Sequence, residues 1–284
     1  EGILTNEWQI KFQQTELYAD MIEHPLAHAE TVKDVEQYEM PDPLAEGRFD
    51  HARSMVEKYG GQYAICGDAE ATIFEISWYL VGMQKFCLDL ARKRPYIFAL
   101  MDRVMEYSLG VAKELINIGA DIIWLGDDVG MQKGMMISPD MWRKVLKDRL
   151  YYVITELKNK KPDLKIAYHC CGSYFPIMPD LIEIGVDIFN ALQPLAANMD
   201  LKIIHDRFGK QASLFGGIDI QKVVPFGTPD DIDAEVKRVI STAAKGGGFI
   251  LAGAHNIQAD TSVEKVLQLY KTAKKYGVYP IQTD

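Results

Sequence analysis

The sequence predicts an α/β fold of the (β/α)8 barrel type, and three observations support this prediction. From about residue 60 onward, short apolar runs alternate with amphipathic helical segments, which implies parallel strands joined by helical crossovers. No G-x-G-x-x-G motif follows a strand, which argues against a dinucleotide-binding Rossmann fold. Strands are expected at 62–66, 120–125, 164–169, 186–192, 212–217 and 248–254, and 278–282 is a candidate for a seventh.

The helices between these strands have recognisable signals. Apolar residues recur at helical spacing along 95–117 and predict one long helix with a buried face. Ser138 before Pro139 predicts a helix start with proline in the first turn. The segments Thr228–Asp231 and Thr261–Glu264 have the pattern of N-terminal caps, with an acidic third residue.

We expect one barrel domain over residues 1–284, in which residues 1–60 form irregular and short helical structure laid over the barrel. No segment rich in proline, glycine or serine divides the chain. The sequence opens on Glu1 and does not read as a protein start. We therefore expect that the natural chain begins upstream and that part of the N-terminal segment of the barrel is missing.

Composition excludes several classes of function. The 284 residues include 48% hydrophobic and 25% charged residues, the values of an ordinary globular chain. Lys and Arg number 31 against 40 Asp and Glu, so the net charge is −9 and a nucleic-acid partner is not expected. No apolar run is long enough to cross a bilayer, so no membrane partner is expected. The four cysteines are too few for a disulfide framework, which favours the reducing cytoplasm.

Polar side chains gather at the predicted strand ends. In a parallel barrel these ends converge on one face, where active sites are built from the loops that follow the strands. The residues expected to line one pocket there are Asp127, Asp128, His169, Cys171, Asn190, Gln193, Asp219 and His255.

The segment YHCCGSYF, residues 168–175, raises the question of a metal site. Side chains at i and i+2 of a strand share a face, so His169 and Cys171 point together while Cys170 points away. Imidazole and thiolate suit zinc, and His255 is the best third ligand, with Asp127 or Asp128 open as a fourth. The competing interpretation is that these are small residues packed at a strand end, because free cysteine is often simply buried.

The chain resembles the uroporphyrinogen decarboxylase superfamily. The resemblance is carried by HCCGS (169–173), GGIDIQKVVPFGTPDDIDAEVKRVI (216–240) and GGFILAGAHNIQADTSVEKVLQLY (247–270), and it covers nearly the whole chain. This superfamily includes decarboxylases and corrinoid-dependent methyltransferases. The zinc methyltransferases have a His-x-Cys-Gly motif, which His169, Cys171 and Gly172 match, but His255 stands where their third ligand is a cysteine.

The resemblance implies a barrel methyltransferase that moves a methyl group between a small donor or acceptor and a corrinoid carried by a partner protein. Methoxylated compounds are one class of donor, as in O-demethylase systems. Zinc on His169, Cys171 and His255 would act as a Lewis acid. Asp127 or Asp128 would supply a proton, and Asp219 would orient the substrate. Residues 68–83 resemble the substrate-side loop of this branch, and the expected wall residues are Glu75, Tyr174, Asn190 and Gln193.

Two alternatives stay open at this point. The first is a metal-free decarboxylase of the uroporphyrinogen type, in which Asp127 or Asp128 binds pyrrole N–H groups. The arginine-rich motif of the decarboxylases has no match here. The second is a corrinoid or tetrapyrrole carrier without catalytic activity, which would bind and release its ligand.

Overall fold

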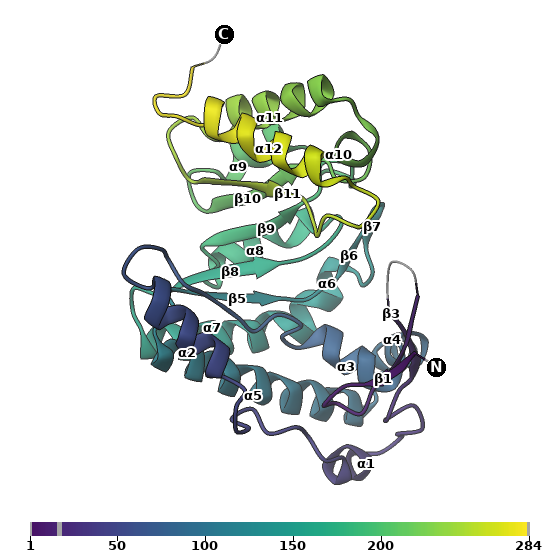
Figure 1. Cartoon of the computed structure of the whole chain (residues 1–284). Coiled ribbons are helices and arrows are strands. Elements are labelled where there is room, and N and C mark those ends of the chain that lie inside the picture. The colour runs from purple at the N-terminus through teal and green to yellow at the C-terminus, as the bar shows by residue number, and fades with distance from the viewer. Residues whose placement is uncertain (1, 16–18, 283–284) are drawn as a thin grey trace. The chain divides into compact units, whose positions relative to one another are not determined.

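The computed structural model describes residues 2–15 and 19–282. The chain folds as two compact units: unit 1 contains residues 1–127 and 141–166, and unit 2 contains residues 128–140 and 167–284. Each unit is described separately below, with the element labels of Figure 1. Among the described helices, none combines the length and the apolar character that a membrane crossing needs.

Unit 1 opens with structure that the sequence did not predict. Three short strands, β1 (Ile3–Thr5), β2 (Lys11–Gln14) and β3 (Ala19–Glu23), form an antiparallel sheet. The expectation of irregular and short helical structure over residues 1–60 is therefore wrong for this stretch. These strands have no buried residue, so they lack the apolar alternation by which strands are recognised. Two helices follow, α1 (Val32–Gln37) and α2 (Asp50–Tyr59).

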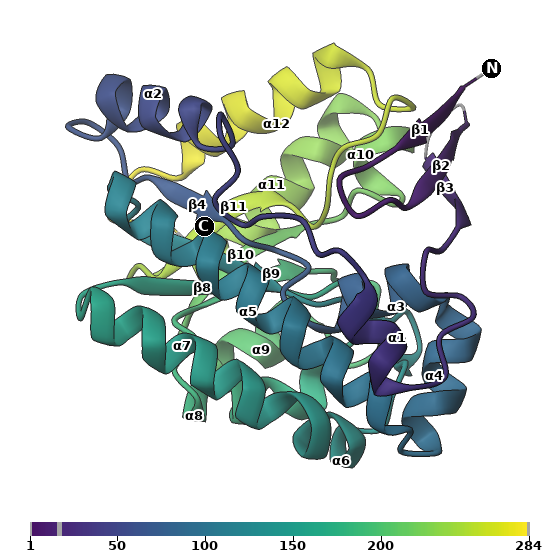
Figure 2. The ribbon, with the colours of Figure 1, turned by 90° about the horizontal axis from the view of Figure 1, so that it is seen from below.

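The rest of unit 1 pairs two parallel strands and covers them with helices. Strand β4 (Cys66–Asp68) pairs with β5 (Ile122–Gly126). Between them run α3 (Phe74–Val81), α4 (Met83–Ala91) and α5 (Pro95–Ile118). Helix α5 buries the predicted apolar face, and it lies beside α1 and α7 (Asp148–Lys160), as Figure 2 shows. A π-helical turn (Arg143–Lys147) precedes α7.

Unit 2 is built around four parallel strands. Their order is β8 (Lys165–His169), β9 (Ile188–Leu192), β10 (Ser213–Ile218) and β11 (Phe249–Gly253); the first two residues of β8 belong to unit 1. The helices of this unit are α8 (Met178–Glu183), α9 (Leu201–Phe208), α10 (Val223–Phe226), α11 (Pro229–Ala243) and α12 (Val263–Tyr276), after a 3-10 turn (Phe175–Ile177). A small hairpin, β6 (Gly130–Met131) and β7 (Gly134–Met135), precedes α6 (Pro139–Trp142). Helices α11 and α12 lie side by side, and α11 also contacts β10 and β11 (Figure 1).

The predicted alternation of parallel strands and helices is confirmed, and within the described residues six parallel strands stand at or near the six predicted positions. The strand predicted at 62–66 begins only at Cys66. The candidate strand at 278–282 does not form. Pro280 there has no N–H group to donate to a neighbouring strand, and Val278 and Tyr279 are exposed.

The predicted helix starts have mixed outcomes. At α11 the Thr228 hydroxyl accepts from the Asp231 N–H at 3.3 Å, and the Asp231 carboxylate accepts from the Thr228 N–H at 2.8 Å, so this capping box is confirmed. Helix α6 begins at Pro139 as predicted. At α12 the N-cap is Ser262 rather than Thr261, and its side chain does not accept from the helix backbone, so the box predicted there is wrong.

Candidate metal centre

Three side chains of unit 2 come together as a group of possible metal ligands. His169 ends β8, Cys171 follows two residues later, and His255 lies just after β11. Their donor atoms all lie within 4.8 Å of one another, and His169 Nε2 is 3.3 Å from Cys171 Sγ. Ligand atoms around a tetrahedral zinc ion are separated by about 3.3–3.6 Å. The two nitrogen donors and one sulfur donor are of the types that bind zinc; the His169–Cys171 separation already matches, and donors up to 4.8 Å apart would have to move closer.

Strand register explains how distant parts of the chain meet here. His169 of β8 is paired with Asn190 of β9, and Ile218 of β10 is paired with Gly253 of β11. The strands are parallel, so their carboxyl ends lie at the same edge of this sheet. His255 follows Gly253 by two residues and thus reaches the edge where His169 lies; the two imidazole centroids are 6.0 Å apart.

The β6–β7 hairpin holds the loop that carries Cys171. The Ser173 N–H donates to the Met131 carbonyl at 2.9 Å. Gly172 has φ +67°, and a Cβ atom there would come within 2.6 Å of the Met131 backbone. A Cβ atom on Gly130 would come within 2.4 Å of the Cys171 carbonyl oxygen. Both positions need glycine because two backbones approach closely at this point.

Asn190 fixes the orientation of the His169 ring. Its Oδ1 lies 2.5 Å from His169 Nδ1, and its Nδ2 donates to the Phe215 carbonyl at 3.3 Å. The second bond sets the amide so that its oxygen faces the imidazole, and the oxygen can only accept. His169 Nδ1 therefore donates to this oxygen, which leaves Nε2, on the side of Cys171, as the ring nitrogen available to a metal. Asn190 was predicted as a wall residue for substrate; in the structure its side chain contacts His169, one of the three possible metal ligands.

Asp128 supplies negative charge beside the group. Its Oδ1 accepts from the Cys171 N–H at 2.5 Å and lies 3.8 Å from His169 Nε2. A carboxylate here favours a cation among the donors. Cys170, by contrast, is fully buried, and its Sγ contacts the Cys171 carbonyl at 3.4 Å.

His255 is suited to bind a metal at neutral pH. Burial lowers its pKa below the ordinary value of histidine, and the neighbouring His169 lowers it further, against the opposing effect of Asp128. The imidazole is thus neutral, and only a neutral imidazole offers a lone pair to a metal.

Asp127, the neighbour of Asp128, makes its contacts within unit 1. Its Oδ1 accepts from the Ile73 and Glu75 N–H groups, both at 3.0 Å, and so caps the start of α3. It is 2% exposed, and burial together with repulsion from Glu75 raises its pKa. Glu75 is itself buried and accepts from the Tyr79 hydroxyl at 2.7 Å. Asp127 and Asp128 thus have different partners: Asp127 caps α3, and Asp128 accepts from the Cys171 N–H.

The remaining predicted site residues support loops of unit 2. Asp219 Oδ1 accepts from the Gln221 and Lys222 N–H groups at 2.8 and 3.2 Å, which shapes the turn after β10. Gln193 Oε1 accepts from the Gly172 N–H at 3.1 Å and from Gln132 Nε2 at 3.0 Å.

The Tyr174 side chain is fully buried and its hydroxyl lies 3.4 Å from the Asn190 carbonyl. Gln132 was not among the predicted residues. The two glycines at 130 and 134 that flank its turn are the sequence signal that could have indicated this hairpin.

Comparisons with known proteins show the family and the fold of this chain. The model of the family described as "Uroporphyrinogen decarboxylase (URO-D)" matches residues 17–276. The methylcobamide:CoM methyltransferase MtbA of Methanosarcina mazei is 21% identical over 256 residues, which are 90% of this chain and 71% of that protein. A solved methyltransferase structure from Methanosarcina mazei matches with a TM-score of 0.75 at 22% identity, over 96% of this chain and 77% of that one. The structural match shows the fold and confirms the barrel-type α/β class.

Proposed function

Because the chain belongs to the uroporphyrinogen decarboxylase family, we propose that it is a methyltransferase of a corrinoid-dependent pathway with zinc held by His169, Cys171 and His255. The observation that carries this proposal is the convergence of two imidazoles and one thiol within 4.8 Å at one sheet edge. The similarity to MtbA, whose name describes methyl transfer from a methylcobamide, supports the same class of reaction.

The proposed reaction moves a methyl group between a small-molecule donor or acceptor, such as a methoxy compound or a thiol, and a corrinoid carried by a partner protein. Bound zinc would supply Lewis acidity to the oxygen or sulfur atom that loses or gains the methyl group. Four free cysteines are consistent with the cytoplasm as the place of this reaction.

The chain's own residues would prepare this chemistry. Asn190 holds His169 in the tautomer that presents Nε2, and Asp128 positions the Cys171 backbone with its carboxylate beside the donors. Of the predicted pair, Asp128 is thus the carboxylate that lies beside the donors and would relay a proton to a leaving oxygen or sulfur. Asp219 and Gln193 would act on substrate through the loops that they shape.

The first test is the metal content of the purified protein. We expect about one zinc ion per chain, most of it lost in Cys171→Ser, because a catalytic zinc needs about three protein ligands. Cys170→Ser is the matched control, since it makes the same change one residue away on a buried thiol outside the donor group. No zinc in protein prepared without chelator, or equal losses from the two variants, would refute the site and leave the metal-free decarboxylase as the better hypothesis.

The second test is turnover. The protein is mixed with a methylated corrinoid and a thiol, or with a reduced corrinoid and a methoxy donor, and the corrinoid absorbance is followed. Methyl transfer that falls together with metal content in Cys171→Ser supports the proposal. Tight corrinoid binding without turnover, unchanged in Cys171→Ser, would instead indicate a carrier.

A further inference from the structure

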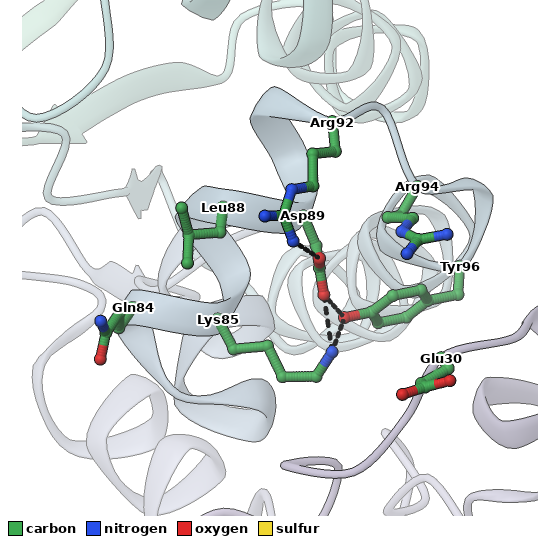
Figure 3. A pocket seen from close by; sticks show the side chains of 8 residues that line it. All are labelled: Glu30, Gln84, Lys85, Leu88, Asp89, Arg92, Arg94 and Tyr96. Carbon is green, nitrogen blue, oxygen red and sulfur yellow. Dashed lines mark hydrogen bonds and ion pairs between the residues drawn. The ribbon is translucent and has the colours of Figure 1, made fainter.

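A polar cavity lies entirely within unit 1 and contains none of the possible metal ligands. It has a volume of about 290 Å³ and is formed between α4 and the start of α5 (Figure 3). The residues that line it are Glu30, Gln84, Lys85, Leu88, Asp89, Arg92, Arg94 and Tyr96. Three of these side chains are cationic, in a chain whose net charge is −9.

The floor of this cavity is an internally satisfied network. Lys85 Nζ lies 2.6 Å from Asp89 Oδ2 and 2.8 Å from the Tyr96 hydroxyl, which donates to the same carboxylate oxygen at 2.5 Å. Burial opposes ionisation of Asp89, but these two hydrogen bonds prevail and lower its pKa, while burial and Asp89 raise the pKa of Tyr96 to about 12. Lys85 and Asp89 thus neutralise one another, and Tyr96 stays protonated.

Two guanidinium groups remain above this floor. Arg92 Nη1 is 4.0 Å from Asp89 Oδ1, beyond hydrogen-bond distance, and its side chain is 64% exposed. Among the described residues, the Arg94 guanidinium makes no hydrogen bond or ion pair, and Figure 3 shows no interaction between it and the other lining side chains. Among the described lining side chains, neither guanidinium thus donates a hydrogen bond, although both interact electrostatically with Asp89, so their N–H donors can serve a ligand.

The helix that follows adds to this positive field. Arg94 directly precedes Pro95, the first residue of the 24-residue helix α5, whose N-terminus carries partial positive charge. The C-terminus of α5 leads into the start of β5, and the helix and the strand run in opposite directions. The N-terminus of α5, and the cavity beside it, therefore lie on the side of unit 1 where β5 ends. Glu30 is the one lining carboxylate outside the Lys85 network.

We propose that this cavity binds the phosphate group of a small anionic molecule, held by Arg92 and Arg94 above the Lys85–Asp89–Tyr96 network. Planar guanidinium groups bind phosphate oxygens through paired, charge-assisted hydrogen bonds, and two of them match a dianion. The volume suits a small ligand rather than a protein segment. The proposal is independent of the metal centre, because its residues all belong to unit 1.

The test is isothermal titration calorimetry, in which inorganic phosphate is added to the full chain at low ionic strength. We expect saturable binding with one site, weakened about tenfold in Arg92→Gln and in Arg94→Gln, since each loses a charged hydrogen-bond donor. Lys93→Gln is the matched control: it removes the same charge between the two arginines, but Lys93 does not line the cavity. Glu30→Gln should strengthen binding, and a gain of this kind cannot arise from misfolding.

Three outcomes would overturn the proposal. One is no saturable binding of phosphate. Another is an equal loss of affinity in Lys93→Gln and Arg94→Gln, which would show only a general effect of charge. The third is acetate binding as tightly as phosphate, which would assign the cavity to a carboxylate, such as an acidic side chain of a partner.

Discussion

Replacement of Asn190 by alanine tests whether the His169 ring is held by its neighbour. The change removes the acceptor of the 2.5 Å contact at Nδ1 of a residue that is only 8% exposed. The lone pair at Nε2 then loses its fixed direction toward the other two donors. We expect weaker metal binding from a residue that does not itself bind the metal.

The magnitude follows from the contact. A buried donor left without a partner costs about 1–3 kcal/mol. Part of this cost is recovered if the ring rotates to find another partner, and rotation also misplaces Nε2. Loss of such an outer hydrogen bond typically lowers metal affinity by about 10–100-fold, which is about 1.4–2.8 kcal/mol. Asn190→Asp keeps an acceptor oxygen and adds charge, so its affinity should equal or exceed that of the wild type.

The assay is competition for Zn²⁺ or Co²⁺ against a chromophoric chelator, with circular dichroism to verify folding. Asn117→Ala is the control. It also removes an asparagine side chain, but one whose hydrogen bond to Glu114 is exposed and involves none of the possible metal ligands. A folded Asn190→Ala protein with unchanged metal affinity would refute the reasoning. So would a loss in Asn190→Asp as large as that in Asn190→Ala.

Three further predictions concern the scaffold. Thr228→Ala should lower the free energy of unfolding by about 1 kcal/mol in urea denaturation, whereas Thr228→Ser should retain the cap of α11. Gly172→Ala should cost at least about 1–2 kcal/mol and weaken metal binding, because of its positive φ and the Met131 backbone 2.6 Å from the added Cβ; a stable variant with normal zinc would contradict this. The hydrogen bond from Arg48 lowers the pKa of Glu7, against a smaller effect of burial, so this carboxylate stabilises the fold above the ordinary glutamate range and its contribution is lost as pH falls. Glu7→Gln should therefore lower the melting temperature at pH 7 but hardly at pH 3, and an equal decrease at both values would contradict the assignment.

Periodicity predicted the elements that bury a face. Helix α5 was predicted at 95–117 and is observed at Pro95–Ile118, because its apolar stripe is continuous. The strands β8 to β11 were predicted because their runs are apolar and bounded by turn residues. Strands β1 to β3 were missed because strands of three to five residues without a buried position carry no such signal.

For the candidate metal centre, the sequence was enough to select the three possible ligands but not the residues that contact them. The i, i+2 relation and the strand ends suffice to group His169, Cys171 and His255. The contact between Asn190 and His169 depends on the register of β8 against β9, which a single sequence does not encode locally. Asp127 and Asp128 look equivalent in sequence, and only the fold assigns one to α3 and the other to the Cys171 loop.

The composition of the donor group has a consequence for which ions it would accept. One thiolate and two neutral imidazoles are soft and borderline donors, and Asp128 is a carboxylate 3.8 Å from His169 Nε2 that lies outside this donor group. Magnesium and calcium prefer several oxygen ligands, so they would compete poorly for such a site. Copper, by contrast, binds nitrogen and sulfur donors more tightly than zinc does. Occupancy by zinc would then reflect which ions the cell makes available rather than discrimination by the ligands themselves.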